Sequence, residues 1–227
     1  LIFAFVLPFS DCMTVKEPVV FGGRTVREVW RLVYDTPLQF AEKPDYPECF
    51  HDYFSYYGLD YPDAEHYFGS FRSGDYLIAG HILVPRFAVE TVFLVHGYLT
   101  HSGYFNHLSK VLLDLNYAVA IIDLPGHGFS SGERASIGSF SEYAKAIKDF
   151  VDILEGTPVP PPYAIIGHSL GCAAITDYLL SNDSPFSRHV FSAPCQIPTL
   201  RSFQVWRLPS GDRNEGDSGN GTRCFLK

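Results

Sequence analysis

One serine of this 227-residue sequence stands between two glycines in a pattern that can expose a nucleophile. The pentapeptide G-H-S-L-G (167–171) follows the apolar run 163–166 and precedes a helical pattern over 173–180. A strand before such a motif and a helix after it place the serine on a strained turn above the carboxyl edge of a sheet. A side chain at either glycine would collide with the neighbouring strand or helix. Ser169 is therefore the candidate nucleophile; the alternative is a tight turn whose serine only caps the helix.

A second motif lies at the end of an earlier apolar run. The segment L-V-H-G-Y (94–98) closes the run that begins at Thr91. Acyl transfer needs two backbone N–H groups where negative charge develops on the carbonyl oxygen. Leu170, directly after the serine, would supply one N–H, and Tyr98 is the candidate for the other. Alone, the His-Gly pair would indicate an ordinary strand-to-loop glycine; beside the serine motif, it predicts an oxyanion hole.

Two other segments contain polar residues, but the spacing of those residues does not match a known catalytic or binding motif. The Gly- and Pro-rich stretch 123–132 has no following Lys or G-K-[ST], so we assign it a structural turn and not a phosphate site. His51, with Cys49 and Asp52, lacks a recognised metal-ligand spacing and is counted as a surface residue. We therefore expect no metal site.

The elements that would position these residues follow from the apolar patterns. Alternation predicts two strands around a turn, short apolar runs predict strands buried on both faces, and 3.6-residue periodicity predicts helices. The expected strands are 66–71, 76–84, 91–95, 117–122, 163–166 and 190–191, and the expected helices are 105–115, 143–154 and 173–180. Ser139 and Glu142 fit a capping box for the middle helix, and Asn116 fits a C-cap. Strand and helix alternate from 91 to 193, which predicts an α/β fold on a mostly parallel sheet.

The amino-acid composition indicates which binding partners and which cellular compartment to expect. The formal net charge of -8 argues against nucleic acid, whose phosphates need a basic surface. Five scattered cysteines form no disulfide framework, so we expect a reducing, cytoplasmic compartment; the alternatives are an exported or membrane-peripheral protein. No stretch approaches the length needed to span a bilayer.

Three motifs in order resemble one known family. They are H-G-x-x-x-H-S-G (96–103), G-H-G-x-S-x-G-E-R (126–134) and G-H-S-x-G (167–171). Over residues 70–195 the chain resembles the monoacylglycerol lipase and lysophospholipase branch of the α/β-hydrolase superfamily. The resemblance implies an α/β-hydrolase fold and hydrolysis of carboxylic esters, often of long-chain monoacylglycerols or lysolipids, without a cofactor. It also implies that Ser169 is the nucleophile and that Tyr98 and Leu170 supply the oxyanion hole. An amide-cleaving or acyl-transferring relative would share the same serine motif.

The acid and base that a serine nucleophile needs are not evident. In this fold they follow the serine as Asp or Glu and then His. The only later histidine is His189, which precedes the strand 190–191 and should lie at the opposite edge of the sheet. His101, near the oxyanion segment, is a weak candidate because the family places its base elsewhere. The later acidic candidates are equally unsuited: Asp177, Asp183, Asp212 and Asp217.

These observations predict three regions. Residues 1–65 form an aromatic-rich extension of helices and loops that packs on the domain or, alternatively, lines an acyl pocket; 66–200 form a partial core without the lid and last strands; 201–227 form a disordered tail. The apolar start, 1–10, suggests translated upstream sequence or a truncated signal. We expect a truncated or frame-shifted lipase-like chain that is nearly inactive. The alternative is a non-catalytic product or interaction module.

Overall fold

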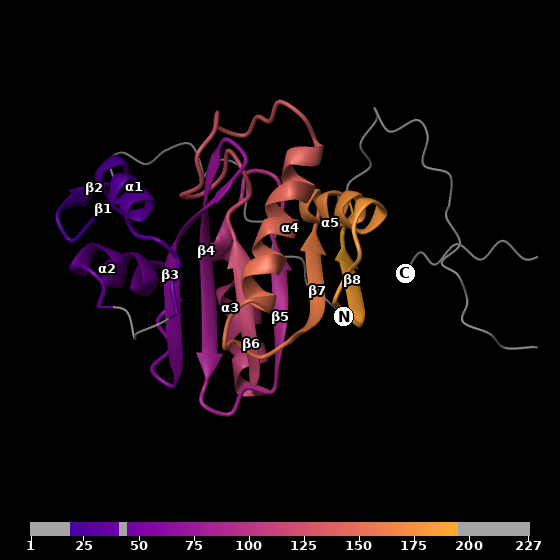
Figure 1. Ribbon diagram of the computed structural model, residues 1–227. Coiled ribbons are helices and arrows are strands. Elements are labelled where there is room, and N and C mark those ends of the chain that lie inside the picture. Colours follow the sequence, from indigo (N-terminus) through magenta and orange to yellow (C-terminus); the bar gives the residue numbers. More distant parts are fainter. Residues whose placement is uncertain (1–18, 41–44, 195–227) are drawn as a thin grey trace, which may run out of the picture. The chain divides into compact units, whose positions relative to one another are not determined.

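A six-stranded sheet forms the centre of the computed structural model, which describes residues 19–40 and 45–194 (Figure 1). Its strands, in spatial order, are β3 (Ala64–Ser73), β4 (Tyr76–Pro85), β6 (Tyr117–Ile122), β5 (Glu90–Val95), β7 (Pro162–His168) and β8 (Arg188–Ser192). β3, β4 and β6 pair antiparallel, whereas β6, β5, β7 and β8 are parallel. The predicted α/β class with a mostly parallel sheet is confirmed.

Helices cover both faces because the buried strands alternate their side chains. Phe93 and Val95 of β5 point to one face, and Val92 and Leu94 point to the other. The helices are α1 (Val26–Asp35), α2 (Glu48–Tyr57), α3 (Asn106–Asp114), α4 (Ser141–Glu155) and α5 (Leu170–Ser181), with a 3₁₀ turn, η2 (Ser102–Phe105), before α3. α4 and α5 pack on the first face, in front of the sheet in Figure 1, and α3 packs on the second.

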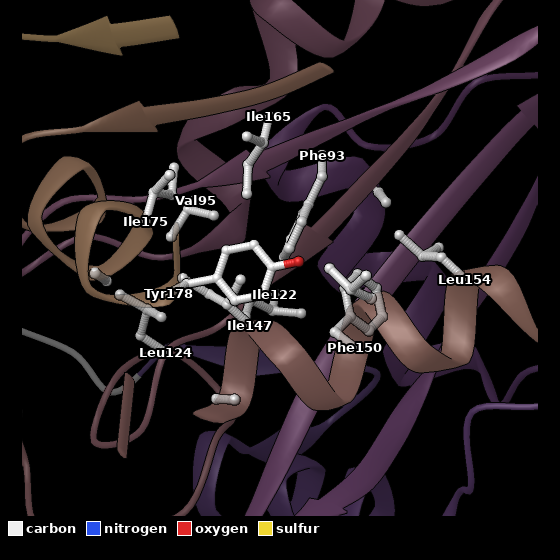
Figure 2. Close-up of a cluster of buried hydrophobic side chains, with 14 of the residues drawn as sticks. Phe93, Val95, Ile122, Leu124, Ile147, Phe150, Leu154, Ile165, Ile175 and Tyr178 are labelled. Carbon is white, nitrogen blue, oxygen red and sulfur yellow. The ribbon is translucent and has the colours of Figure 1, made fainter. Parts of the chain in front are cut away.

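The largest apolar cluster lies between the sheet and helices α4 and α5. Figure 2 shows Ile147, Phe150 and Leu154 of α4 directed toward the side chains of the strands. Phe150 is fully buried and contacts the ring of Phe93, with a centroid separation of 5.1 Å. This cluster fixes α5, and therefore the turn that leads into it, on the sheet.

An aromatic layer joins the N-terminal helices to the antiparallel strands. Phe50, Tyr53 and Phe54 of α2 pack on Phe68 of β3, together with Val29 and Val33 of α1. α1 begins at a full capping box, in which Thr25 and Glu28 satisfy each other's backbone N–H groups. The short hairpin of β1 (Val20–Phe21) and β2 (Arg24–Thr25) precedes α1. The division of the chain at residues 65 and 200 stays a prediction.

One edge strand of the sheet, β3, pairs with a neighbouring segment, whereas the other edge strand, β8, is exposed. The segment after α1 runs along β3, with the Leu38 N–H donating to the Ser70 carbonyl at 2.9 Å and the Ser70 N–H donating to Thr36 at 2.8 Å. All five residues of β8 are exposed, including Val190 at 46% and Phe191 at 42%. Among the described strands, β8 therefore presents an uncovered apolar edge.

Most predicted elements are present, with one local correction. Strand β3 begins two residues earlier and ends two later than the alternation predicts, and α5 begins directly after Ser169. The capping box predicted at Ser139 is only half formed. The Ser139 N–H donates to Glu142 at 3.2 Å, but the Ser139 hydroxyl bonds to Ser141 and the helix starts after Phe140. Ser139 and Ser141, two residues apart, compete to cap the same helix start, and the sequence pattern alone does not decide between them.

Several expectations fall on residues that the structure does not describe. The apolar start (1–10), the tail (201–227) and the acidic candidates Asp212 and Asp217 lie outside the described residues. Within the described residues, none of the helices combines the length and the apolar character needed to cross a bilayer.

Candidate active site

Ser169 occupies the turn between strand β7 and helix α5. Its φ of 50° and ψ of -111° are outside the regions that an L-residue adopts without strain. Its side chain makes no capping hydrogen bond, so the helix-cap alternative does not describe this serine. Its own N–H donates to the Ser192 carbonyl of β8 at 3.0 Å, which holds the turn against the sheet. The backbone is therefore fixed, and the hydroxyl makes no hydrogen bond with any residue that the structure describes.

The two motif glycines are required by close packing. A Cβ on Gly167 would lie 2.7 Å from the Ile175 side chain and 2.8 Å from the Cys172 nitrogen of α5. A Cβ on Gly171 would overlap the Val95 carbonyl oxygen and come within 2.7 Å of the His96 carbonyl oxygen. These collisions, one with the helix and one with the end of β5, are those that the sequence predicts.

The loop after β5 lies directly against the serine. A Cβ on Gly97 would be 3.2 Å from the Ser169 Cβ, so the absence of a side chain there leaves room at the hydroxyl. Gly97 begins a tight turn in which Leu99 has a φ of 59° and the Thr100 N–H and hydroxyl both approach the Gly97 carbonyl, at 3.4 and 2.9 Å. The structure thus brings together the two motifs that carry the predicted site.

The backbone N–H groups of Leu170 and Tyr98 are the candidate oxyanion donors. The N–H of Leu170 is the first of α5, where the helix leaves its donors unpaired and its dipole is positive. Neither this N–H nor that of Tyr98 donates a hydrogen bond to any residue that the structure describes. A carbonyl oxygen that acquires negative charge is the ligand that such donors suit.

His96 serves as a structural link rather than as a base. It is 1% exposed, and its Nε2 accepts the Leu124 N–H at 2.9 Å, so the proton lies on Nδ1, which donates to the Gly97 carbonyl at 2.7 Å. Burial lowers its pKa to about 4, although the nearby Asp123 acts in the opposite direction. The neutral ring therefore joins the loop after β5 to the loop after β6.

Asp123 organises the second loop, as the structural assignment of 123–132 predicts. Its buried carboxylate accepts the N–H groups of Ser102 at 2.7 Å and Phe129 at 2.8 Å. Gly128, with a φ of 47°, packs so tightly on this carboxylate that no side chain fits there. The acid is thereby enclosed by backbone and does not reach the serine.

No histidine of the chain bonds to the Ser169 hydroxyl within the described residues, which include all nine histidines. His189 pairs with Ile165, near the start of β8, and approaches the Ser184 hydroxyl at 3.4 Å. The Nδ1 of His101 accepts the Gly103 N–H at 3.2 Å and caps η2. His168 is exposed beside Gly97. Neither predicted weak candidate is placed as a base.

Three large side chains that follow β5 in the sequence are exposed. Tyr98, Leu99 and Tyr104 are 52%, 56% and 59% exposed on the loop after β5. Across the described part of the chain, no group of three or more His, Cys, Asp or Glu side chains could hold a metal ion.

Comparison with known proteins gives the family. Residues 88–209, more than half of the chain, match the family described as serine aminopeptidase, S33. A monoacylglycerol lipase of Mycolicibacterium smegmatis is 29% identical over 103 residues, which are 45% of this chain and 37% of that protein. Human monoglyceride lipase is 29% identical over 136 residues, 60% of this chain and 45% of that protein. The matched part spans less than half the length of these two relatives.

Solved structures agree on the fold. A CIB-like hydrolase of Thermoplasma acidophilum has a TM-score of 0.50 at 20% identity, over 60% of this chain and 67% of that one. A cold-adapted esterase from an Arctic intertidal metagenomic library has a TM-score of 0.50 at 18% identity, over 58% of this chain and 62% of that one. The chain thus has the α/β-hydrolase fold and belongs to the serine aminopeptidase S33 family.

Proposed function

We propose that this chain carries the serine site of a carboxylic ester hydrolase of the monoacylglycerol lipase or lysophospholipase type. The observation that carries the proposal is the position of Ser169, on a strained turn with Gly97 against its side chain. The family match and the lipase relatives support an esterase over a binding module.

The proposed reaction has two acyl-transfer steps. The Ser169 oxygen attacks the ester carbonyl carbon and gives its proton to a base, while charge develops on the carbonyl oxygen between the N–H groups of Tyr98 and Leu170. The C–O bond then breaks, the alcohol leaves with a proton, and Ser169 holds the acyl group. Water then attacks the acyl carbon, again through an oxyanion at the same two donors. The bond between that carbon and the Ser169 oxygen breaks, the serine takes up a proton given by the water, and the carboxylic acid is released.

The substrate that we propose has a long acyl chain. Exposed Tyr98, Leu99 and Tyr104 give the loop beside Ser169 an apolar surface on which such a chain can lie. The names of the relatives, monoacylglycerol lipase and monoglyceride lipase, support the same class. The acidic net charge and the scattered cysteines support a small-molecule partner and a cytoplasmic compartment.

We further propose that the 227-residue chain by itself turns over slowly. His96, His81 and His66 are engaged in buried hydrogen bonds, and the other six histidines make none with Ser169. Without a base, a serine site retains only the catalysis that the oxyanion hole and binding supply, about 10³–10⁴-fold over water. Addition of imidazole should therefore restore part of the missing proton transfer.

The alternative, a non-catalytic interaction module, is favoured by one observation. Val190 and Phe191 on the uncovered edge strand β8 are both more than 40% exposed, which is costly unless a partner covers them. A module of this kind would bind through β8 and leave Ser169 unreactive.

Labelling of the full chain with a fluorophosphonate distinguishes the two. The ester hydrolase proposal predicts a slow adduct on Ser169, located by mass spectrometry and accelerated at least about tenfold by imidazole. Ser169→Ala should form no adduct there, and Ser192→Ala, a matched change on β8, should label normally. The absence of any Ser169 adduct with imidazole would refute the esterase site. Rapid turnover of a p-nitrophenyl ester without imidazole, abolished by Ser169→Ala, would refute the proposal that no base serves Ser169 in this chain.

A further inference from the structure

Four side chains from four separate elements form a hydrogen-bonded chain beneath the loop after β5. His66 Nε2 of β3 lies 2.9 Å from His81 Nδ1 of β4. His81 Nε2 lies 3.2 Å from the Ser102 hydroxyl of η2, which lies 3.4 Å from the Tyr53 hydroxyl of α2. His81 and Ser102 are fully buried, Tyr53 is 2% exposed, and His66 is half-buried. Water therefore cannot readily replace a lost partner at Tyr53.

The direction of the hydrogen bonds follows from the Tyr53 hydroxyl. Its proton has one acceptor among the described residues, the Ser102 oxygen. If Tyr53 donates to Ser102, Ser102 donates to His81 Nε2, and His81 must then carry its proton on Nδ1 and donate to His66 Nε2. In this arrangement every member is satisfied, and both histidines are neutral.

One added proton reverses the chain. If His81 or His66 is protonated, the bond between the rings still holds one proton, so His81 Nε2 must carry a proton and donate to Ser102. Ser102 then either donates to the Tyr53 oxygen, which leaves the Tyr53 proton without an acceptor, or accepts from both His81 and Tyr53, which leaves its own proton without one. In both cases one buried hydroxyl proton among these groups is unpaired. A buried donor without a partner destabilises the closed structure.

The surrounding groups favour the neutral pair. His51 of α2 and His101, before η2, both oppose a positive charge on the pair. Among the described residues, Asp123 is the acidic group that faces the cluster, and its carboxylate accepts the N–H groups of Ser102 and Phe129. The other neighbours are aromatic rings: Phe54, Phe68 and Phe129. Burial lowers the pKa of His66 to about 3 and that of His81 well below its usual value.

The same serine fixes the loop that contains the candidate oxyanion donor. The Ser102 N–H is held by Asp123, its hydroxyl by His81, and the loop runs back from Ser102 to Gly97, which touches Ser169. We propose that the His66–His81 pair is an acid-sensitive latch, which holds the loop 97–105 in place only while both rings are neutral. The consequence for Ser169 reactivity rests on the proposed function; the latch itself does not.

The tautomer of His81 gives a direct test on the unmodified chain. Long-range ¹H–¹⁵N spectra at neutral pH should show the proton of His81 on Nδ1 and its Nε2 as an acceptor. A proton on Nε2 would overturn the proposed direction of the chain.

Hydrogen exchange tests the opening. Between pH 6 and 4 the opened loop takes up a proton on each histidine that it frees. The protection of the Ser102 amide should therefore fall about tenfold per pH unit for each histidine that is freed, up to about a hundredfold for His66 and His81 together, relative to Phe93 of β5. The Gly103 amide is not used, because it donates to His101, which the opening also frees. His66→Gln keeps an acceptor for His81 but removes one titrating ring, so the fall should be about tenfold shallower per unit. His107→Gln, an exposed histidine on α3, is the matched control and should exchange as wild type does.

Two results would overturn the latch: pH-independent relative protection at Ser102, or a His66→Gln chain that behaves as wild type. Neither result depends on Ser169. If the latch is confirmed but phosphonate labelling of Ser169 does not change as the loop opens, only the link between the latch and Ser169 fails; the proposed function fails separately, if Ser169 forms no adduct at all.

Discussion

At the scale of single residues, the site depends on backbone positions that only certain residues can occupy. Gly167, Gly171 and Gly97 each lie where a Cβ would collide with a neighbour, and Ser169 itself adopts a positive φ. These requirements are local, so the G-x-S-x-G and His-Gly patterns predict them. The His66–His81–Ser102 chain could not be predicted, because strand pairing and the position of η2 bring its members together. The Thr25-x-x-Glu28 capping box is a local signal of the same kind, although it is not among the helix starts predicted above.

Gly171→Ala tests the close approach of α5 to β5. The added methyl would meet the Val95 and His96 carbonyl oxygens, both backbone atoms at the end of a buried strand. We expect a loss of about 1–3 kcal/mol in the free energy of unfolding, measured by urea titration. Gly138→Ala is the control, since its nearest neighbour would be a Glu142 oxygen at 3.5 Å. Equal stability of the two variants would contradict this packing.

Gly97→Ala tests the space at the hydroxyl. The methyl would lie 3.2 Å from the Ser169 Cβ and 3.0 Å from the His168 ring, whose side chain is exposed and able to move. We expect imidazole-assisted phosphonate labelling of Ser169 to slow by about tenfold or more. The melting temperature should change little. Labelling at the wild-type rate would mean that this loop does not border the reacting atom.

At the scale of elements, the strands and helices from 76 to 192 follow the sequence pattern closely. Two-faced burial makes β5 and β6 continuous apolar runs, and amphipathic periodicity marks α3 and α4. The predictions are wrong at the ends of helices and strands. At the start of α4, for example, Ser139 and Ser141 compete to cap the helix. For the aromatic residues before position 65 the sequence favours packing on the domain over an acyl pocket, because aromatic rings are more often part of a core. In the structure, α2 packs on β3.

Phe150→Ala tests whether α4 anchors the sheet face that supports the serine turn. Its ring is fully buried against Phe93 and Phe71, and a Cβ on Gly80 would touch it at 3.1 Å. We expect a loss of about 3–5 kcal/mol from the cavity that remains. Val111→Ala on α3, 55% exposed, should change the free energy of unfolding by less than about 0.5 kcal/mol. A small effect at position 150 would show that this core is loosely packed.

At the scale of the whole molecule, buried histidines connect stability to pH. His66 and His96 have pKa values lowered to about 3 and about 4, chiefly by burial. A lowered histidine pKa means that the folded state holds the neutral form, so its stability is fully present above the ordinary value of 6.5 and is lost as pH falls below it. The loss continues until the folded pKa is reached.

The free energy of unfolding should therefore fall between pH 6.5 and 4. His96 alone, 1% exposed, accounts for up to about 1.4 kcal/mol per pH unit in this window. Urea titrations at intervals from pH 7.5 to 4 measure the slope. A stability that stays flat or rises over this range would contradict the assignment of neutral, buried rings.

The central claim is that the Tyr98 and Leu170 N–H groups face the point where a Ser169 adduct carries its negative oxygen. The most direct measurement is a crystal structure of the chain phosphonylated at Ser169. We predict a phosphonyl oxygen about 2.7–3.1 Å from both nitrogens. An adduct whose oxygen points to solvent, or reaches neither N–H, would contradict the claim.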